Sequence, residues 1–209
     1  MGSKNISMAV IRRLPKYHRY LGDLLDKDIQ RISSKELSDI IGFTASQIRQ
    51  DLNNFGGFGQ QGYGYNVGAL HNEIGKILGL DKKYNAVLIG AGNLGQAIAN
   101  YSGFRKAGFE VKALFDANPR MIGLKIREFE VLDSEDIEEF VKQNEIDIAI
   151  LCIPKNGAQN IVNRLVKQGI KGIWNFAPID LEVPKDVIVE NVNLTESLFT
   201  LSYLMKESE

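Results

Sequence analysis

The stretch Gly90–Gly95, which reads GAGNLG, constrains the fold of this chain more than any other feature. It follows the apolar run Ala86–Ile89 and opens onto a helical pattern, the order found in dinucleotide-binding βαβ units. Gly90 permits a tight turn, Gly92 lets backbone amides approach a pyrophosphate, and Gly95 allows the helix to pack closely on the strand. The N-terminus of that helix supplies positive partial charge. The sequence therefore predicts a phosphate-binding turn.

An acidic residue stands where a dinucleotide-binding unit needs one. Asp116 directly follows a second apolar run, Val111–Phe115. Its carboxylate can accept hydrogen bonds from both ribose hydroxyls of an adenosine, whereas a 2′-phosphate there would meet an uncompensated negative charge. We therefore expect NADH/NAD⁺ rather than the 2′-phosphorylated cofactor. The cofactor-binding residues expected from this pattern are Gly90, Ala91, Gly92, Asn93, Leu94, Gly95 and Asp116.

Strand and helix patterns alternate from residue 82 onward, which predicts a Rossmann-type, doubly wound parallel sheet with helices on both faces. The expected strands are 86–89, 111–115, 124–126, 146–153, 172–176 and 187–192, and the expected helices are 93–106, 134–143 and 158–167. A dinucleotide would lie outside the carboxyl ends of the strands, near Gly90, Asp116, Pro154 and Phe176. A last helix from Thr195 has an apolar stripe but no strand left to cover.

About 80 residues precede this unit, and they carry the pattern of a helix-turn-helix. An amphipathic helix is expected over 7–27, with an early break at Pro15. The capping box Ser33–Glu36 (S-x-x-E) opens a short helix that ends at Gly42, and a second box, Thr44–Gln47 (T-x-x-Q), opens another. Two short capped helices joined at a glycine are typical of helix-turn-helix modules, whose second helix lies in the major groove of DNA.

A glycine-rich stretch follows the second helix. Residues 55–67 contain five glycines and alternate Tyr63, Tyr65 and Val67, which predicts a β-hairpin wing with its tip at Gln60–Gly62. Outward amides on the helix suit adenine edges, and an arginine there suits a guanine or a phosphate, although a polar outer face can also be merely solvated. The DNA-binding residues expected are Thr44, Ser46, Gln47, Arg49, Gln50, Asn53, Gln60, Gln61, Gly62 and Tyr63.

Charge and composition agree with this division. Residues 1–80 carry ten Lys or Arg and seven Asp or Glu, a net +3, which leaves fifteen against nineteen, a net −4, for the remainder. Positive charge in the N-terminal part is what nucleic-acid binding requires. The single cysteine, Cys152, allows neither a disulfide nor a cysteine metal cluster. We find no apolar stretch of eighteen residues and no signal peptide, and expect a soluble cytoplasmic protein with no membrane or metal partner.

Several segments together resemble the Rex family of redox-sensing transcriptional repressors. They are 11–21 (IRRLPKYHRYL), 33–67, 90–104 (GAGNLGQAIANYSGF), 115–119 (FDANP) and 172–178 (GIWNFAP), and they span almost the whole chain. The resemblance implies a homodimer that binds palindromic operator DNA and is released when NADH, rather than NAD⁺, binds. It implies a winged helix-turn-helix domain over 1–80, a Rossmann-type domain over 81–192 and a C-terminal helix over 193–209. That helix would be swapped into the partner subunit, between its two domains.

The resemblance also assigns residues by position. The cofactor-site residues that it adds are Tyr101, Pro154, Asn175, Phe176 and, entering from the partner subunit, Phe199. The residues that it assigns to coupling between the domains are Arg19, Tyr101 and Asn193. The chain departs from the family at the wing tip, where Gln60-Gln61 stands in place of a frequent basic pair, although amides can still read an A·T-rich groove. Asn193 replaces a usual aspartate and cannot form a full ion pair with Arg19.

Two other classes of protein share the nucleotide-binding pattern. A dehydrogenase usually needs a positioned acid or base, commonly histidine, but His18 and His71 both precede the nucleotide-binding unit. A coenzyme A-binding domain has the same architecture, but the 3′-phosphate of coenzyme A would meet Asp116. Neither alternative accounts for the helix-turn-helix and wing. We therefore expect an NADH-responsive repressor without catalytic residues. The alternative is an NAD-dependent dehydrogenase or a coenzyme A-binding protein with an appended helix-turn-helix.

Overall fold

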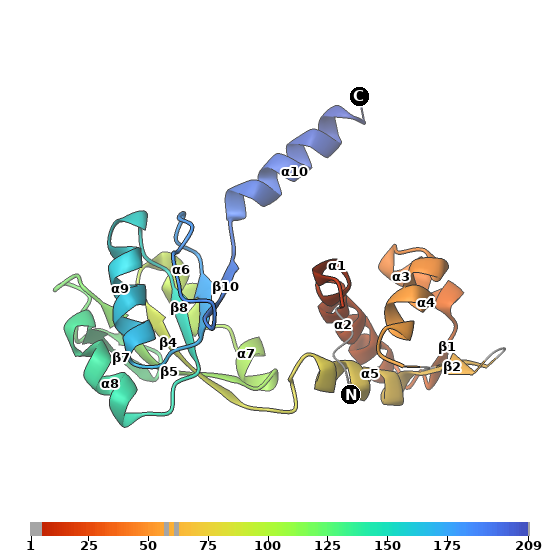
Figure 1. Ribbon diagram of the computed structural model, residues 1–209, viewed down its shortest axis with the longest axis horizontal. Helices are drawn as coiled ribbons and strands as arrows, with labels where there is room; N and C mark the ends of the chain where they lie inside the picture. The colour runs from red at the N-terminus through yellow and green to blue at the C-terminus, as the bar shows by residue number, and fades with distance from the viewer. Residues whose placement is uncertain (1–5, 57–58, 61–62, 209) are drawn as a thin grey trace. The chain divides into compact units, whose positions relative to one another are not determined.

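The computed structural model describes residues 6–56, 59–60 and 63–208, and the chain divides into two compact units, Met1–Lys82 and Lys83–Glu209 (Figure 1). The first unit is a winged helix-turn-helix. Its elements are α1 (Met8–Ile11), α2 (Leu14–Leu25), β1 (Arg31–Ile32), α3 (Ser34–Ile41), α4 (Ala45–Asn53), β2 (Gly59–Gln60), β3 (Gly64–Asn66) and α5 (Val67–Ile77). The expected break near Pro15 is confirmed: α1 and α2 are separate helices, and Pro15 lies in the first turn of α2, where a backbone N–H is not needed.

Helix caps define the helix-turn-helix. Ser33 Oγ accepts from the Glu36 amide while the Glu36 carboxylate accepts from the Ser33 amide, so the first capping box is complete. Gly42 ends α3 in the left-handed region, at φ +80°. Thr44 Oγ1 accepts from the Gln47 amide, but the Gln47 side chain donates to Asp51 instead of reaching back. The second box expected from the sequence is therefore wrong in that half, because a carboxylate is the stronger acceptor.

The wing is a small antiparallel sheet with strand order β1-β3-β2. Two features differ from expectation. The sequence pattern does not predict β1, and Val67 begins α5 rather than extending the hairpin, because Asn66 caps that helix by accepting from the Ala69 amide at 2.8 Å. Gln60 lies in β2, whereas Gln61 and Gly62 fall outside the described residues.

Two histidines stack where α2 packs against α5. The ring centroids of His18 and His71 are 3.9 Å apart, with 26° between the planes. Each ring lies beside a glycine of the opposite helix: a Cβ on Gly75 would lie 3.3 Å from His18 Nε2, and one on Gly22 would lie 3.5 Å from His71 Nε2. Burial lowers the pKa of His18, and the charge of His71 lowers it further. The packing of these helices therefore favours a neutral imidazole at His18.

We expect the first unit to lose stability as the pH falls below about 6.5, the usual pKa of an unfolded histidine. His18 binds a proton less well in the folded state, so its contribution is complete above the unfolded pKa and is lost as the pH falls toward the lower folded pKa. Thermal unfolding between about pH 7.5 and about pH 5.5 should show a steeper decline for the native protein than for His18→Gln. Equal declines in both proteins would remove His18 as the cause.

The second unit is a doubly wound α/β domain, as the sequence predicts. Its elements are β4 (Tyr84–Ile89), α6 (Asn93–Ala99), α7 (Gly103–Lys106), β5 (Phe109–Asp116), β6 (Lys125–Ile126), β7 (Phe129–Asp133), η1 (Ser134–Asp136), α8 (Ile137–Gln143), β8 (Ile148–Leu151), α9 (Lys155–Lys167), β9 (Gly172–Asn175), β10 (Ile188–Asn191) and α10 (Leu194–Lys206). The sheet order is β10-β9-β8-β4-β5-β7-β6, and the β6–β7 pair is antiparallel. The chain reverses its direction of progress at β4, which is the switch point where such folds bind ligands.

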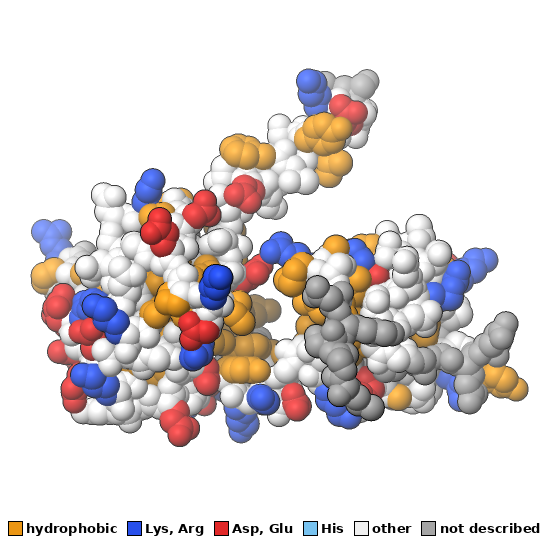
Figure 2. Space-filling view, in the orientation of Figure 1, with side chains coloured by type: hydrophobic (Ala, Val, Ile, Leu, Met, Phe, Trp, Pro, Cys, Tyr) orange, Lys and Arg blue, Asp and Glu red, His pale blue; other side chains and the backbone are white. Residues whose placement is uncertain are grey.

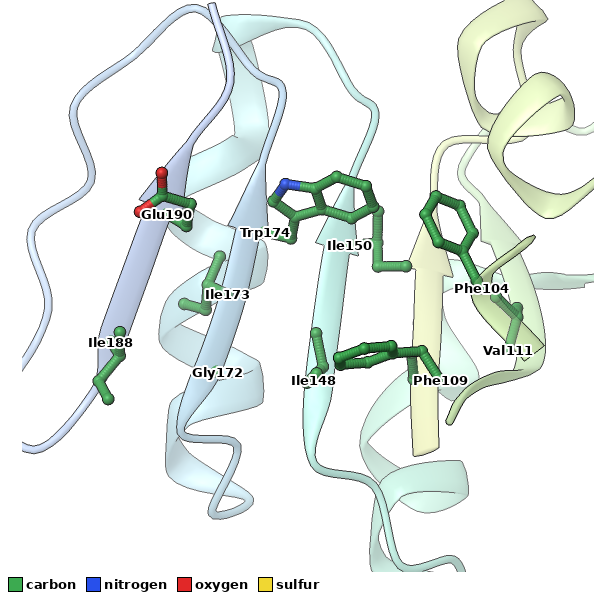
Figure 3. Close-up of a pocket in the computed structure, with 11 residues that line it drawn as sticks. Phe104, Phe109, Val111, Ile148, Ile150, Gly172, Ile173, Trp174, Ile188 and Glu190 are labelled. Carbon is green, nitrogen blue, oxygen red and sulfur yellow. The ribbon is translucent and has the colours of Figure 1, made fainter. Parts of the chain in front are cut away.

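The two faces of this sheet are covered unequally. Alternate residues of β4 point to opposite faces, with Val87 packing on the side of α8 and α9, and Leu88 on the side of α6 and α7. The helix expected over 93–106 is broken into α6 and α7, and the sequence pattern does not predict β7. No helix lies in the connection 176–187, all of which the structure describes. Strands β8 to β10 thus carry an apolar surface on the α7 side (Figure 3).

Candidate functional site

The turn after β4 has the geometry that a phosphate-binding loop needs. Gly90 has φ +98°, and a Cβ there would overlap the carbonyl group of Cys152. A Cβ on Gly95 would overlap the carbonyl oxygen of Gly90, so this glycine lets α6 approach the turn. A Cβ on Gly92, the N-cap of α6, would meet nothing within 4 Å. Gly90 and Gly95 are thus required by the fold itself, whereas Gly92 borders open space.

Asp116 joins the end of β5 to this turn. Its Oδ2 accepts from the Ala91 amide at 2.7 Å, and its Oδ1 accepts from the Asn118 amide at 2.8 Å. A carboxylate has about four acceptor positions, so two backbone bonds leave capacity for ribose hydroxyls. Asp116 therefore holds the turn in place and can still contact a nucleotide.

A cavity of about 300 Å³ lies at the carboxyl ends of β4, β5 and β8. It is lined by Ile89, Gly90, Gly92, Asp116, Ala117, Ser134, Cys152, Ile153, Pro154, Asn156, Gly157 and Ile161. Of these, Gly90, Gly92, Asp116 and Pro154 are among the cofactor residues expected from the sequence, and the other eight are not. The Asn156-Gly157 pair is one of those eight, although Asn-Gly is a turn signal. Gly157 has φ +94° and breaks the start of α9, so regular helix begins at about residue 158, as the sequence predicts. Burial raises the pKa of Cys152 to about 12, so its thiol stays neutral.

Other residues assigned to the cofactor site lie elsewhere in this chain. Asn175 is buried, and its Nδ2 donates to the carbonyl groups of Ala177 and Ile179 and to Asn191 Oδ1. These bonds make Asn175 a scaffold for the strand ends. Phe176 lines a separate depression between the ends of β9 and β10, whose lining continues to Glu196 at the start of α10.

The residues assigned to coupling are distributed over both units. Arg19, in the first unit, packs over the Tyr20 ring, with its Cζ 4.8 Å from the centroid. Tyr101 follows α6, is 61% exposed, and contacts Phe104 edge to face. Asn193 caps α10, its Oδ1 accepting from the Thr195 amide at 3.0 Å. Because aspartate caps a helix as well as asparagine, the change from the family residue does not weaken this helix.

An apolar groove of about 400 Å³ lies on the α7 side of the sheet, where it crosses strands β8 to β10. Figure 3 shows the side chains of Ile150, Trp174, Phe104 and Phe109 gathered along this face. Trp174 makes an edge-to-face contact with Phe104 at a centroid distance of 5.4 Å. An exposed apolar surface of this kind usually marks an interaction site.

The last helix also exposes apolar side chains (Figure 2). None of its residues is buried, and Phe199 is 68% exposed. Its exposed apolar residues are Leu194, Leu198, Phe199, Leu201, Tyr203, Leu204 and Met205. A helix with this many exposed apolar residues, none of them buried within its own chain, is expected to pack against another surface.

The outer face of α4 carries the expected DNA-contact pattern in part. Ser46, Arg49, Gln50 and Asn53 are exposed and border one open depression. The Arg49 guanidinium donates to Ser34 Oγ at 2.9 Å, so its position is set by the start of α3. In the wing, Tyr63 is 70% exposed.

Asp51 is a buried charge in α4 that sequence reasoning missed. Its side chain is fully buried and accepts from Arg13, Tyr17 and Gln47. Burial raises the pKa of the carboxyl group, but the hydrogen bonds from Arg13, Tyr17 and Gln47 together hold that pKa below its usual value. Burial of the Tyr17 hydroxyl likewise raises the pKa of that group. An aspartate between the core positions Ile48 and Leu52 was the sequence feature that could have revealed it.

The part of the chain that the structure describes contains neither a membrane-spanning helix nor a metal-binding cluster. Its helices are all too short or too polar to cross a membrane. Its His, Cys, Asp and Glu side chains nowhere gather in a group of three or more that could hold a metal ion.

Comparisons with known proteins agree with both units. Residues 81–179 match the family model "CoA binding domain", and residues 5–53 match "Putative DNA-binding protein N-terminus". A redox-sensing transcriptional repressor Rex of Clostridioides difficile is 87% identical over the whole of both chains. One of Caldanaerobacter subterraneus is 69% identical over 98% of this chain and 91% of its own.

Solved structures of Rex-type repressors are similar as well. The structure described as RSP with β-NAD⁺ and operator DNA has a TM-score of 0.92 and 66% identity, over 99% of this chain and 95% of that one. RSP with β-NADH has a TM-score of 0.90 and 63% identity, over 99% and 97% of the two chains. Identity of this extent along the full length shows that the chain belongs to the Rex family of redox-sensing transcriptional repressors.

Proposed function

We propose that this protein is a transcriptional repressor that binds palindromic operator DNA as a homodimer and leaves it when NADH binds. The observation that carries this proposal is the presence, in one chain, of an exposed polar face on α4 and a cavity at the glycine turn that is lined by Asp116. The structures of RSP with β-NAD⁺ and operator DNA, and with β-NADH, support the binding of both DNA and the dinucleotide. We place the protein in the cytoplasm, where bacterial DNA and the NADH pool are found together.

The alternatives have less support. Close relatives are named repressors, so the chain is a regulator rather than a dehydrogenase, despite its nucleotide-binding fold. The family model named for coenzyme A covers the same fold. Asp116 at the end of β5 disfavours the 3′-phosphate of coenzyme A for the same reason that it disfavours a 2′-phosphate.

Gly92 and the amides of the first turn of α6 would hold the pyrophosphate, with Asp116 binding the adenosine ribose. A cavity of about 300 Å³ accommodates only part of a dinucleotide. The nicotinamide end would therefore extend beyond it and be enclosed on dimerisation by Phe199 of the partner subunit. Enclosure by apolar groups favours NADH over NAD⁺, because burying the cationic ring without a counter-charge is costly.

The dimer would bury the apolar surfaces that one chain leaves exposed. We propose three parts, 1–80 for DNA binding, 81–192 for cofactor binding and 193–209 as the exchanged helix. The exposed stripe of α10 and the apolar groove over β8 to β10 support this assembly. NADH would change the arrangement of the units through Arg19, Tyr101 and Asn193, and a ligand can do so only by binding one arrangement more tightly than another.

Titration of a protein–operator complex with NADH tests this function. We expect NADH to release the DNA and NAD⁺ to be far less effective, measured by fluorescence anisotropy of labelled operator. Asp116→Ala should need a higher NADH concentration, by roughly tenfold for the loss of hydrogen bonds to a charged acceptor, and should discriminate less against NADPH.

The matched control is Asp133→Ala at the end of the neighbouring strand β7. There the carboxylate accepts from the Glu135 amide rather than from the glycine turn. Asp133→Ala should therefore leave the NADH response unchanged. Release of operator by NADH and NAD⁺ at the same concentration would contradict redox sensing.

A further inference from the structure

We infer that Asp51 is a positioning residue for base recognition. It turns the side-chain amide of Gln47 so that Oε1 is the end free for the operator, which selects a base with an amino group on its major-groove edge, adenine or cytosine. This inference rests on the proposed function, because it needs α4 to lie in the major groove.

The carboxylate of Asp51 is shared between two sets of partners. Its Oδ2 accepts from Arg13 Nε at 2.6 Å and from the Tyr17 hydroxyl at 2.7 Å. Its Oδ1 accepts from Arg13 Nη2 at 2.8 Å and from Gln47 Nε2 at 2.8 Å. Arg13 and Tyr17 therefore anchor the carboxylate, and Gln47 is the partner on the same helix.

This arrangement leaves the Gln47 amide one orientation. An ionised carboxylate only accepts hydrogen bonds, so the amide must present Nε2, not Oε1, to Asp51. The bidentate contact with Arg13 keeps Asp51 ionised. Oε1, on the other branch of the amide, remains unengaged by Asp51.

The position of Gln47 suits a base contact. It lies in the first turn of α4, since the Thr44 cap accepts from its amide, and its side chain is half-buried rather than fully enclosed. The N-terminal residues of a recognition helix are those that reach base edges. The orientation of the Gln47 amide therefore affects which base the helix recognises.

The selection follows from the major-groove edges of the bases. Adenine and cytosine present amino donors there, whereas guanine O6 and thymine O4 are acceptors. An amide free to rotate can satisfy either kind, but one held with Oε1 outward pairs best with an amino group. Asp51 would therefore contribute to specificity without touching DNA.

The test measures the affinity of the full-length protein for an operator series in which each half-site base pair is replaced in turn. For the native protein we expect one position at which adenine or cytosine is preferred by roughly tenfold over guanine or thymine on the same strand. Asp51→Asn should reduce that preference to about twofold, because an asparagine amide can donate to Oε1 and let Gln47 rotate. Other positions should keep their preferences.

Three further variants separate positioning from stability. Gln47→Met should lose the same preference, and Asp51→Asn in that background should change it no further. Tyr17→Phe, which removes a partner of Oδ2 only, should lower the melting temperature and leave base preference intact. Gln47→Met keeps the test decisive even where Asp51→Asn folds poorly.

The outcomes are distinguishable. Uniform weakening across all base pairs by Asp51→Asn, or an unchanged preference in Gln47→Met, would overturn this inference alone. Absence of any sequence-specific binding by the native protein would overturn the proposed function and this inference with it.

Discussion

Removal of residues 194–209 is expected to convert the protein to a monomer and to weaken binding to a palindromic operator by about 10²–10⁴-fold. The cause is the loss of α10, whose apolar residues are all exposed in one chain and are proposed to be covered by the partner. Two linked recognition helices bind two half-sites with a high effective concentration, which separate subunits lack. Analytical ultracentrifugation and anisotropy with labelled operator would measure both effects.

A single half-site is the matched control for this truncation. Because α10 is separate from the DNA-binding unit in sequence, affinity for a half-site should be nearly unchanged. A truncated protein that remains dimeric, or that keeps its full affinity for the palindrome, would show that α10 is not the dimerisation element.

Gly95→Ala should destabilise the second unit by about 3 kcal/mol or more and abolish NADH binding. The new Cβ would overlap the Gly90 carbonyl oxygen, and a backbone atom cannot move aside by changing rotamer. The start of α6 would be pushed away from β4. Urea unfolding followed by circular dichroism gives the stability change, and calorimetry gives the NADH affinity.

Gly92→Val is the partner variant in the same turn. It lies at φ −70° with open space around it, so the folded state should keep nearly its native stability. Its side chain would occupy the space proposed for the pyrophosphate, and NADH affinity should fall as far as in Gly95→Ala. Tight NADH binding by Gly92→Val would contradict the proposed placement of the cofactor.

Much of the second unit could be predicted because its determinants are local. The glycine turn, the acidic strand end at Asp116 and the strand alternation each depend on residues adjacent in the sequence. The break between α6 and α7 and the short strand β7 were missed, since brief segments carry weak periodicity. In the wing, the alternation that ends at Val67 favours a strand, but the Asn66 cap starts a helix there.

The Asp51 site could not be predicted for a different reason. Its partners Arg13 and Tyr17 lie 38 and 34 residues earlier in the chain, and they reach Asp51 only through the tertiary structure of the first unit. Similarly, the sequence motif containing Asn175 resembles a cofactor segment, but its local hydrogen bonds to Ala177 and Ile179 give it a scaffold role within one chain. Whether it also contacts NADH stays a prediction.

The exposed stripe of α10 has a genetic consequence. If subunits are joined by exchanging this helix, a subunit with a defective DNA-binding unit but an intact α10 still enters dimers with normal subunits. Random pairing of equal amounts leaves only about a quarter of the dimers with two working recognition helices. Substitutions in α4 would therefore be dominant over the normal allele, whereas loss of α10 would be recessive.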